Sequence, residues 1–416
     1  MARKLLPLLV ALLVLTVFAP GARALINVQS DGTDGALNVA VNDTLDLSLA
    51  TTGVWNDPAI GSTNGIYDAD QWAVVYHFTS VNIVSGKTLY FKNHPSGAPV
   101  VWLVSGNVTI AGTLALNGQD GQLNGNVSEP GPGGFRGGRG LVSTSTGSAG
   151  FGPGGGTYPS GSAGYSATAG GIVYGNARIL PLVGGSGGGG VSTYGQGGGA
   201  GGGAILIAAA GSITVSGTVT ATGGSWAYDG GGNYSGSGSG GGIRFIADAV
   251  ATNASSAVLG ANGGPGTASV GRIRIEANTI NLSQGSISPN ASVMLGIENN
   301  EAVLWPLSTS PSVQVTTLAG LPVPADPSAD FIPPGDLLVI ATDSVDVEIV
   351  AKNVPTDLAR RWNVKLRVVL RSGVQYLRAA SYDSGDSTQS LWTTKLPPLP
   401  DADFVAIQAR VSKPGY

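Results

Sequence analysis

The fold of this chain is indicated by Val108-Thr109-Ile110-Ala111-Gly112-Thr113-Leu114-Ala115-Leu116-Asn117-Gly118 and its counterpart Ile213-Thr214-Val215-Ser216-Gly217-Thr218-Val219-Thr220-Ala221-Thr222-Gly223. In both stretches apolar residues occupy matching alternate positions, and a glycine separates two short segments. Alternation with period two predicts β-strands. Repetition of one such unit is typical of a solenoid. We therefore expect an all-β protein whose main body is a parallel β-helix.

A preceding apolar segment recurs seven or eight residues ahead of this module. Its copies are Val101-Trp102-Leu103, Ile205-Leu206-Ile207, Ile243-Arg244-Phe245 and Ile273-Arg274-Ile275. This spacing aligns Val101 with Ile205, and Ile243 with Ile273. Once the glycine-rich inserts are set aside, roughly 22 residues remain per repeat, which suits one turn built from short strands.

Long glycine-rich inserts interrupt the repeats, at about 119–203 and 223–242. Between residues 131 and 242 the charged residues are Arg136, Arg139, Arg178 and Asp229 alone. Such a composition is typical of a disordered linker. Dispersed aromatic residues, and glycine's tolerance of close backbone approach, favour a packed structure instead. The sequence leaves both interpretations open.

The composition changes near Trp305-Pro306, so we predict a β-helix over 25–305 and a second domain over 306–416. Val345, Val347 and Ile349 alternate with acidic residues, and a similar alternation follows near Val364. Half-buried strands at short spacing predict a small antiparallel β-sandwich of roughly immunoglobulin or fibronectin type.

The N-terminal segment has the pattern of a secretory signal peptide. Arg3 and Lys4 precede an apolar run that ends near Phe18, and Ala22-Arg23-Ala24 forms a small-x-small cleavage site. We expect residues 1–24 to be removed and the mature protein to be secreted, extracellular or at the cell surface. No later apolar run is long enough to span a membrane. The chain contains no cysteine, so disulfides cannot stabilise it.

Charge and motif patterns narrow the classes of partner. The net charge is −4 and only 11% of residues are charged, against about a quarter in typical proteins. Such a chain offers no basic face for nucleic acid. We expect no cofactor, and no residue cluster has the spacing of a metal site. Asp31-Gly32-Thr33-Asp34-Gly35 lacks the closing acidic ligand of a calcium loop and predicts a turn.

Stacking of the repeats predicts one charged patch on the outer face of the β-helix. Arg244 would stack over Arg274, Ile246 over Glu276, and Asp248 over Asn278. Such a patch could serve a polysaccharide lyase or hydrolase, with Asp248 and Glu276 as catalytic carboxylates and the two arginines gripping an acidic sugar. The alternative is a salt-bridge ladder on a solvated sheet face. Neither stacked column holds two carboxylates, so the sequence favours a non-enzymatic protein and leaves the enzyme open.

Aromatic residues in the inserts provide the candidate ligand-binding residues. Trp226, Tyr228 and Tyr234 lie in a glycine-rich loop, and exposed aromatic rings can stack on sugar faces. We therefore expect an adhesive or glycan-binding protein whose partner is a polysaccharide or cell-surface glycan. A purely structural, self-associating coat or matrix subunit is the main alternative, since the charge is low and a solenoid can stack.

The stretch from Leu25 to about residue 300 resembles secreted bacterial glycine-rich parallel β-helix proteins of adhesin-like kind. The resemblance is carried by Asp31-Gly32-Thr33-Asp34-Gly35-Ala36-Leu37-Asn38, Phe91-Lys92-Asn93-His94-Pro95, Pro99-Val100-Val101-Trp102-Leu103-Val104-Ser105-Gly106 and Gly131-Pro132-Gly133-Gly134-Phe135. It implies the architecture and brings no catalytic residues. In composition alone, the inserts are also similar to the polyproline-II tips of some phage adhesins.

Overall fold

The computed structural model describes residues 25–413 apart from 59, 61–62, 141–147, 158–169, 173, 192–194, 229, 231–233, 267, 325–335, 340–343, 357–361, 371–374 and 398–404. The expected signal peptide and Asp229 therefore lie outside the described residues. Strands account for 43% of the chain and helical turns for 2%, so the protein is all-β, as expected. Within the described residues no helix is long and apolar enough to cross a membrane.

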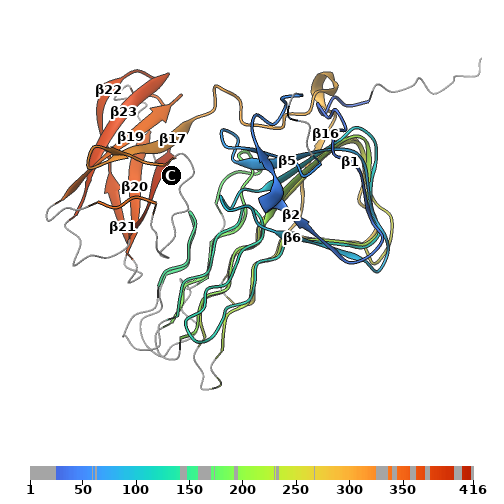
Figure 1. Ribbon diagram of the computed structural model, residues 1–416, viewed down its shortest axis with the longest axis horizontal. Helices are drawn as coiled ribbons and strands as arrows, with labels where there is room; N and C mark the ends of the chain where they lie inside the picture. The colour runs from blue at the N-terminus through green and yellow to red at the C-terminus, as the bar shows by residue number, and fades with distance from the viewer. Residues whose placement is uncertain are drawn as a thin grey trace, which may run out of the picture.

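In the described part of the chain, one sheet has ten strands, and all but one of its pairings are parallel; β4 and β5 run antiparallel (Figure 1). Its path is β16-β14-β12-β10-β7-β5-β4-β3, with β1 added to β5 and β8 to both β5 and β10. The strands are β1 (Gly35–Val39), β3 (Thr51–Thr52), β4 (Ile66–Asp68), β5 (Ala73–Ile83), β7 (Val100–Val104), β8 (Val108–Ile110), β10 (Ala204–Val215), β12 (Gly242–Thr252), β14 (Arg272–Asn281) and β16 (Ser292–Leu295).

A second sheet of six parallel strands, again counted over the described residues, follows the order β15-β13-β11-β9-β6-β2. These strands are β2 (Asp43–Asp46), β6 (Thr88–Lys92), β9 (Thr113–Ala115), β11 (Thr218–Thr220), β13 (Val258–Gly260) and β15 (Ser286–Ser288). Among the described residues, two short 3₁₀ turns flank the sheets, η1 (Leu47–Leu49) and η2 (Glu298–Asn300).

The repeated module places one short strand in each sheet. Val108–Ile110 belongs to the ten-stranded sheet and Thr113–Ala115 to the six-stranded sheet, with Gly112 at the turn between them. The second copy behaves in the same way, since β10 is followed by β11. The alternating apolar side chains of both sheets, such as Ile110 and Leu114, form one buried core. The predicted strand module is therefore confirmed.

The predicted register between repeats is right for the later copies and wrong for the first. Ile243 pairs with Ile273 and Arg244 with Arg274, as expected. Ile205, however, pairs with Val100 and not with Val101. A shift of one residue moves a side chain to the opposite face of a sheet. Val101 consequently lies on the outer face, whereas Val100 lies in the core between the sheets.

The outer face of the ten-stranded sheet is buried as well. Val101 and Leu206 pack there in a second apolar cluster, covered by segments from before β1, between strands and after β16. The covering residues include Ile26, Val28, Trp55, Ile179, Leu182, Ile297 and Leu304. Strands buried on both faces are expected to be apolar at every position. This explains the unbroken run Val100-Val101-Trp102-Leu103-Val104.

The described residues of the glycine-rich segments at 116–203, 221–241 and 261–271 extend away from the sheets side by side (Figure 1). We call their described residues the glycine bundle. Backbone hydrogen bonds join one segment to the next, as from Gly188 to Gly199 and from Gly199 to Gly236. These residues lie outside strands and are largely buried. The described parts of the inserts are thus packed, in agreement with the compact interpretation of their composition.

The hydrogen bonds of the glycine bundle repeat every three residues. In the segment 197–204, the N–H groups of Gly197, Ala200 and Gly203 donate to the segment 116–122, those of Gly198, Gly201 and Ala204 to the segment 132–138, and those of Gly199 and Gly202 to the segment 236–239. A period of three residues per turn is that of polyproline II. One segment can therefore bond to three neighbours in turn.

The remaining strands form two antiparallel sheets with a sandwich-like arrangement, at the left of Figure 1. Over the described residues, the larger contains β17 (Ser312–Leu318), β18 (Leu321–Pro322), β19 (Val345–Lys352), β22 (Ser381–Gly385) and β23 (Gln389–Leu396), and the smaller contains β20 (Asn363–Leu370), β21 (Gln375–Ala379) and β24 (Val405–Ser412). Their shared core contains Val347, Ile349, Leu366 and Trp392. The predicted inward alternation at Val345, Val347 and Ile349 is confirmed.

Candidate functional site at the end of the glycine bundle

The three aromatic residues chosen from sequence come together where the segment 223–241 reverses direction. Tyr228 and Tyr234 form an isolated antiparallel bridge. Their rings stack with centroids 4.6 Å apart and an interplanar angle of 16°. Trp226 meets Tyr234 edge to face at 5.5 Å and 87°. Tyr228 is 46% exposed, while Trp226 and Tyr234 are half-buried. We call these three residues the aromatic cluster.

Buried hydrogen bonds attach the aromatic cluster to the glycine bundle. The Ser235 hydroxyl accepts from the backbone N–H of Ala227 at 2.8 Å and donates to the carbonyl of Gly197 at 2.7 Å. The N–H of Gly121 donates to the carbonyl of Ser225 at 2.7 Å. Residues on both sides of the cluster are therefore held by neighbouring segments. The rings are presented on an ordered support, which lowers the entropic cost of binding a ligand.

Of the four charged residues predicted for an enzyme site, Arg244, Arg274 and Glu276 form a largely buried cluster. The Arg244 guanidinium contacts Glu276 Oε1 through Nε at 2.9 Å and through Nη2 at 2.8 Å. Arg274 Nε lies 3.4 Å from the same oxygen. The side chains of Arg244 and Glu276 are 2% and 8% exposed. The prediction of a solvated outer face is therefore wrong here, because apolar side chains and a later segment cover this face of the sheet.

The covering segment directly closes the arginine site. Arg244 Nη2 donates to the carbonyl of Val303 at 2.7 Å, and Nη1 to that of Leu304 at 3.4 Å. Burial lowers the pKa of Arg244, and the neighbouring Glu276 carboxylate opposes that shift. Asp248 accepts a hydrogen bond from Asn278 at 3.0 Å instead. The arrangement does not present Asp248 and Glu276 as an open pair of catalytic carboxylates.

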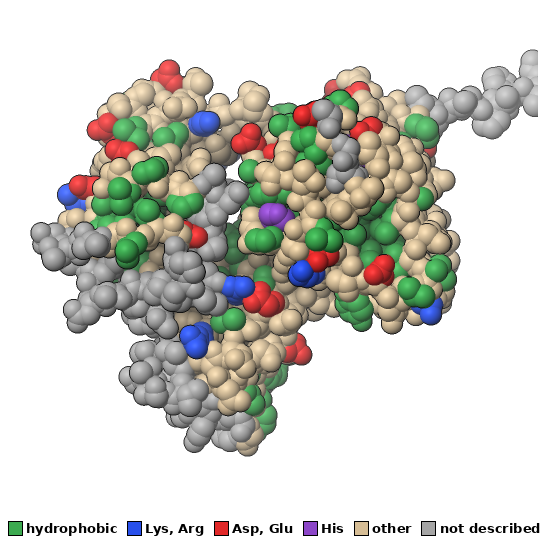
Figure 2. Space-filling model, viewed as in Figure 1, with side chains coloured by type: hydrophobic (Ala, Val, Ile, Leu, Met, Phe, Trp, Pro, Cys, Tyr) green, Lys and Arg blue, Asp and Glu red, His purple; other side chains and the backbone are tan. Residues whose placement is uncertain are grey.

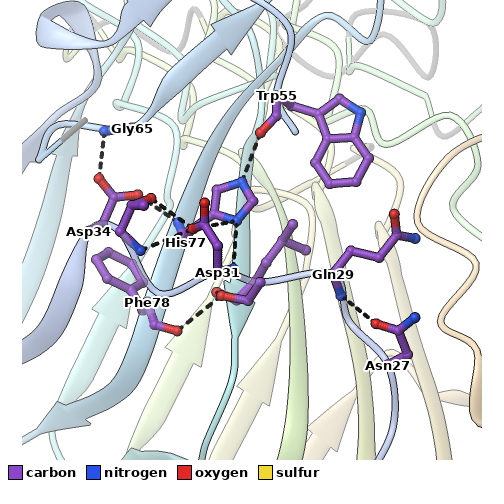
Figure 3. Close-up of polar contacts among 11 residues, drawn as sticks. Asn27, Gln29, Asp31, Asp34, Trp55, Gly65, His77 and Phe78 are labelled. Carbon is purple, nitrogen blue, oxygen red and sulfur yellow. Dashed lines mark hydrogen bonds and ion pairs between the residues drawn. The ribbon is translucent and has the colours of Figure 1, made fainter. Parts of the chain in front are cut away.

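His77 takes part in a polar network near the N-terminus (Figure 3). Its Nε2 lies 2.8 Å from the carbonyl of Trp55, and its Nδ1 lies 3.4 Å from Asp31. Asp34 accepts from the backbone N–H groups of His77 at 2.6 Å and Gly65 at 3.1 Å. Burial raises the pKa of Asp34 despite these hydrogen bonds.

Asp31 forms the turn predicted for this stretch, since it accepts from both the N–H and the hydroxyl of Thr33. Burial raises the pKa of Asp31, but the Thr33 hydrogen bonds and His77 outweigh that effect, so the pKa is lowered. The network therefore joins the segment before β1 to β5. Among the described residues, no group of three His, Cys, Asp or Glu side chains is placed to hold a metal ion.

A cleft that the sequence does not predict lies between the glycine bundle and the antiparallel sheets. It has a volume of about 800 Å³, and its lining runs from Tyr90 in β6 to Gln408 in β24. Figure 2 shows the molecule from the same side as Figure 1, with the antiparallel sheets at the left. Residues 318 positions apart carry no shared local pattern. Two stretches singled out in the sequence do line the cleft, namely all of Phe91-Lys92-Asn93-His94-Pro95 and most of Gly131-Pro132-Gly133-Gly134-Phe135.

No protein-family model, curated protein or solved structure matches this chain. Its candidate function therefore depends on the geometry of its own residues.

Proposed function

We propose that this protein is a non-enzymatic carbohydrate-binding protein that acts at a cell surface or in an extracellular matrix. The observation that carries the proposal is the aromatic cluster, in which an exposed tyrosine ring stacks on a second ring beside an indole. Aromatic faces stack on the apolar faces of sugar rings, and hydroxyl and indole N–H groups at their edges can hydrogen-bond to the sugar. Secretion is proposed from the N-terminal sequence alone.

We also propose that the two parallel sheets are the faces of a β-helix and that the antiparallel sheets form an immunoglobulin- or fibronectin-like sandwich. In favour of the β-helix, the chain passes from the larger to the smaller sheet in each repeat, at β8–β9, β10–β11, β12–β13 and β14–β15. The stacked repeats would act as a scaffold that holds the glycine bundle outward. Binding residues are commonly carried by loops on such scaffolds.

The binding proposal is tested by measuring retention of the mature protein on a panel of immobilised neutral and acidic polysaccharides. Cleavage of each polysaccharide is measured in the same experiment. We expect retention on at least one polysaccharide without cleavage. Replacing Trp226, Tyr228 and Tyr234 by alanine should weaken that binding about tenfold or more, because each aromatic contact contributes on the order of 1 kcal/mol.

Tyr228→Phe is the matched control, since it keeps the exposed ring and removes only the hydroxyl. It should retain most of the binding that Tyr228→Ala loses. Undiminished retention of the triple alanine variant on every polysaccharide would refute the aromatic cluster as the site. Cleavage of any polysaccharide by the wild-type protein would refute the non-enzymatic assignment.

A structural, self-associating role is the second candidate, favoured by the end of the ten-stranded sheet. Within the described residues, β16 is the last strand on that path. Val293 and Leu295 in β16 are 48% and 71% exposed. A terminal strand with exposed apolar side chains is a surface on which another chain can pair. Sedimentation at increasing concentration tests this role, and a strictly monomeric protein would contradict it.

A further inference from the structure

We propose that the 800 Å³ cleft is a second binding site, selective for short neutral oligosaccharides and independent of the aromatic cluster. Its walls come from β6 and the following loop, from the glycine bundle, and from β20 and β24. The volume lies within the range of about 300–1,000 Å³ that is typical of ligand sites. Sites between two structural units are common locations for such ligands.

The cleft is held in place by contacts across its base. Arg367 Nη1 donates to the carbonyl of Gly152 at 2.6 Å. Beside it, Val369 and Ala406 pack with Ala149 and Phe151 of the glycine bundle. These contacts join the antiparallel sheets to the bundle. The cleft is thus largely formed before a ligand arrives, which reduces the ordering cost of binding.

Aromatic rings line one side of the cleft. Tyr90 is 50% exposed, and Phe91, Phe135 and Phe151 also line the cleft. His94 contributes as well, and its ring stacks on Tyr67 with centroids 4.1 Å apart. Flat rings beside hydrophilic groups suit sugars, which combine an apolar ring face with equatorial hydroxyls.

An unpaired acceptor lies on the opposite wall. Among the described residues, Gln408 has a buried side-chain oxygen that lacks a hydrogen-bond partner. Gln408 pairs with Arg367 across β20 and β24, so both side chains lie on the sheet face turned to the bundle. A buried polar atom without a partner costs free energy. Gln408 lines the cleft, so a rotation of its amide in the bound state would let a sugar hydroxyl supply the missing donor.

The charges in the cleft favour a neutral ligand. Arg136 is paired with Glu129 through Nε at 3.0 Å and Nη2 at 2.9 Å. Lys92 Nζ lies 2.8 Å from Asp46. A sugar carboxylate would have to compete with these acidic partners for Arg136 and Lys92, and with the carbonyls of Gly152 and Gly155 for Arg367. The amides of Asn93, Asn117 and Gln119, which also line the cleft, can hydrogen-bond to uncharged hydroxyls instead.

The test is calorimetric titration of the full-length mature protein with cellotetraose, laminaritetraose, maltotetraose, mannotetraose and trigalacturonate. Each titration is repeated in the Trp226/Tyr228/Tyr234 triple alanine variant. We expect at least one neutral tetraose to bind the wild type and the triple variant with the same cleft affinity. Binding that persists in the triple variant reports on the cleft alone, whereas binding lost in that variant reports on the aromatic cluster, so the two proposals are tested separately.

In that triple variant, Tyr90→Ala and Gln408→Met should each weaken binding about tenfold, since each removes one contact with the ligand. Tyr90→Phe should bind normally. Gln408→Met keeps the side-chain size and should not lower the melting temperature, because it removes an unpaired buried oxygen. Tyr90 is half-exposed, so its substitution carries the test even if the Gln408 variant folds poorly.

Hydrogen exchange gives a second measurement. Bound tetraose should slow exchange in residues 93–97 and 405–408 while leaving 226–235 unchanged. The proposal is overturned if no neutral tetraose binds, if trigalacturonate binds more tightly than every neutral probe, or if Tyr90→Ala and Gln408→Met both bind like their parent.

Discussion

A methyl group on Gly198 would lie 2.0 Å from the carbonyl oxygen of Gly188, far inside contact distance. Gly198 is not among the residues with positive φ, so its backbone conformation alone does not require glycine. The requirement comes from the approach of a neighbouring segment. A methyl added at many other glycines of the bundle would meet a backbone oxygen as closely; at Gly201 it would lie 1.9 Å from the carbonyl oxygen of Gly185.

Gly198→Ala should therefore lower the free energy of unfolding by about 3 kcal/mol, since the added methyl overpacks a site that cannot relax cheaply. Urea unfolding measures this change. Gly260→Ala is the matched control, because its nearest atom beyond the chain neighbours is Thr220 Cγ2 at 3.4 Å. The control should alter stability by about 1 kcal/mol at most. Equal effects of the two substitutions would contradict a packed glycine bundle.

The buried Arg244–Glu276 ion pair predicts a large loss of stability when one of its partners is removed. Glu276→Gln would leave the Arg244 guanidinium buried without its carboxylate partner. Removing one member of such a pair costs about 3–5 kcal/mol. We expect a loss of stability in that range by urea unfolding.

Asp346→Asn is the control for Glu276→Gln. Asp346 lies 2.8 Å from Lys395, but both side chains are about two-thirds exposed. An exposed pair contributes about 0–1 kcal/mol, so this variant should be nearly as stable as the wild type. Similar losses in both variants would show that Glu276 is not sequestered from water.

At the scale of elements, the two parallel sheets differ in how many faces they bury. All five residues of β7 are buried. In β11 only the central Val219 is buried, while Thr218 and Thr220 are partly exposed. The larger sheet lies between the inner core and the outer apolar cluster, whereas the smaller sheet covers the core from one side. The unbroken and alternating apolar patterns of these strands follow from that difference.

Leu206→Ala tests the buried outer face of the larger sheet. Leu206 is 1% exposed, so the substitution should lower the free energy of unfolding by about 2–5 kcal/mol through lost burial and a cavity. Thr218→Ala, on the outer face of the smaller sheet, should change stability by about 0.5 kcal/mol or less. Thermal and urea unfolding measure both. A small effect at Leu206 would mean that the outer apolar cluster is not packed.

At the scale of the whole molecule, a few contacts join the antiparallel sheets to the glycine bundle. Arg367 donates to the carbonyls of Gly152 and Gly155, at 2.6 and 3.4 Å. Its own burial, and to a lesser extent Arg410, lower its pKa to about 10. Because the proposed oligosaccharide cleft lies across this contact, its shape depends on how firmly the two parts are joined.

Arg367→Met should weaken that contact by about 2 kcal/mol, the usual contribution of a hydrogen bond from a charged group. We expect a larger radius of gyration by small-angle scattering. The circular dichroism spectrum should change little, because the antiparallel sheets and the parallel sheets each keep their own secondary structure. Arg410 is exposed and lies on β24, so Arg410→Met serves as the control and should leave the radius unchanged. An unchanged radius for Arg367→Met would indicate that the apolar contact at Val369 suffices.

The sequence alone determined the local structure of this protein. Alternation around Gly112 and Gly217 predicted strand pairs, because side-chain direction in a strand depends only on its own backbone. The charged residue within Ile243-Arg244-Phe245 likewise identified the inward positions and so the register with the next repeat. The sequence also indicated Trp226, Tyr228 and Tyr234 as candidate binding residues, and the structure brings these three side chains into contact.

Only the tertiary structure decided what packs against these strands. Val100 and Val101 are both apolar, so the sequence pattern does not indicate which of the two side chains faces the core between the sheets. The sequence predicted a solvated Arg244, but in the structure the segment 303–304 covers this side chain. The cleft from Tyr90 to Gln408 had no local signature at all. Such features depend on contacts between residues far apart in the chain, which periodicity does not encode.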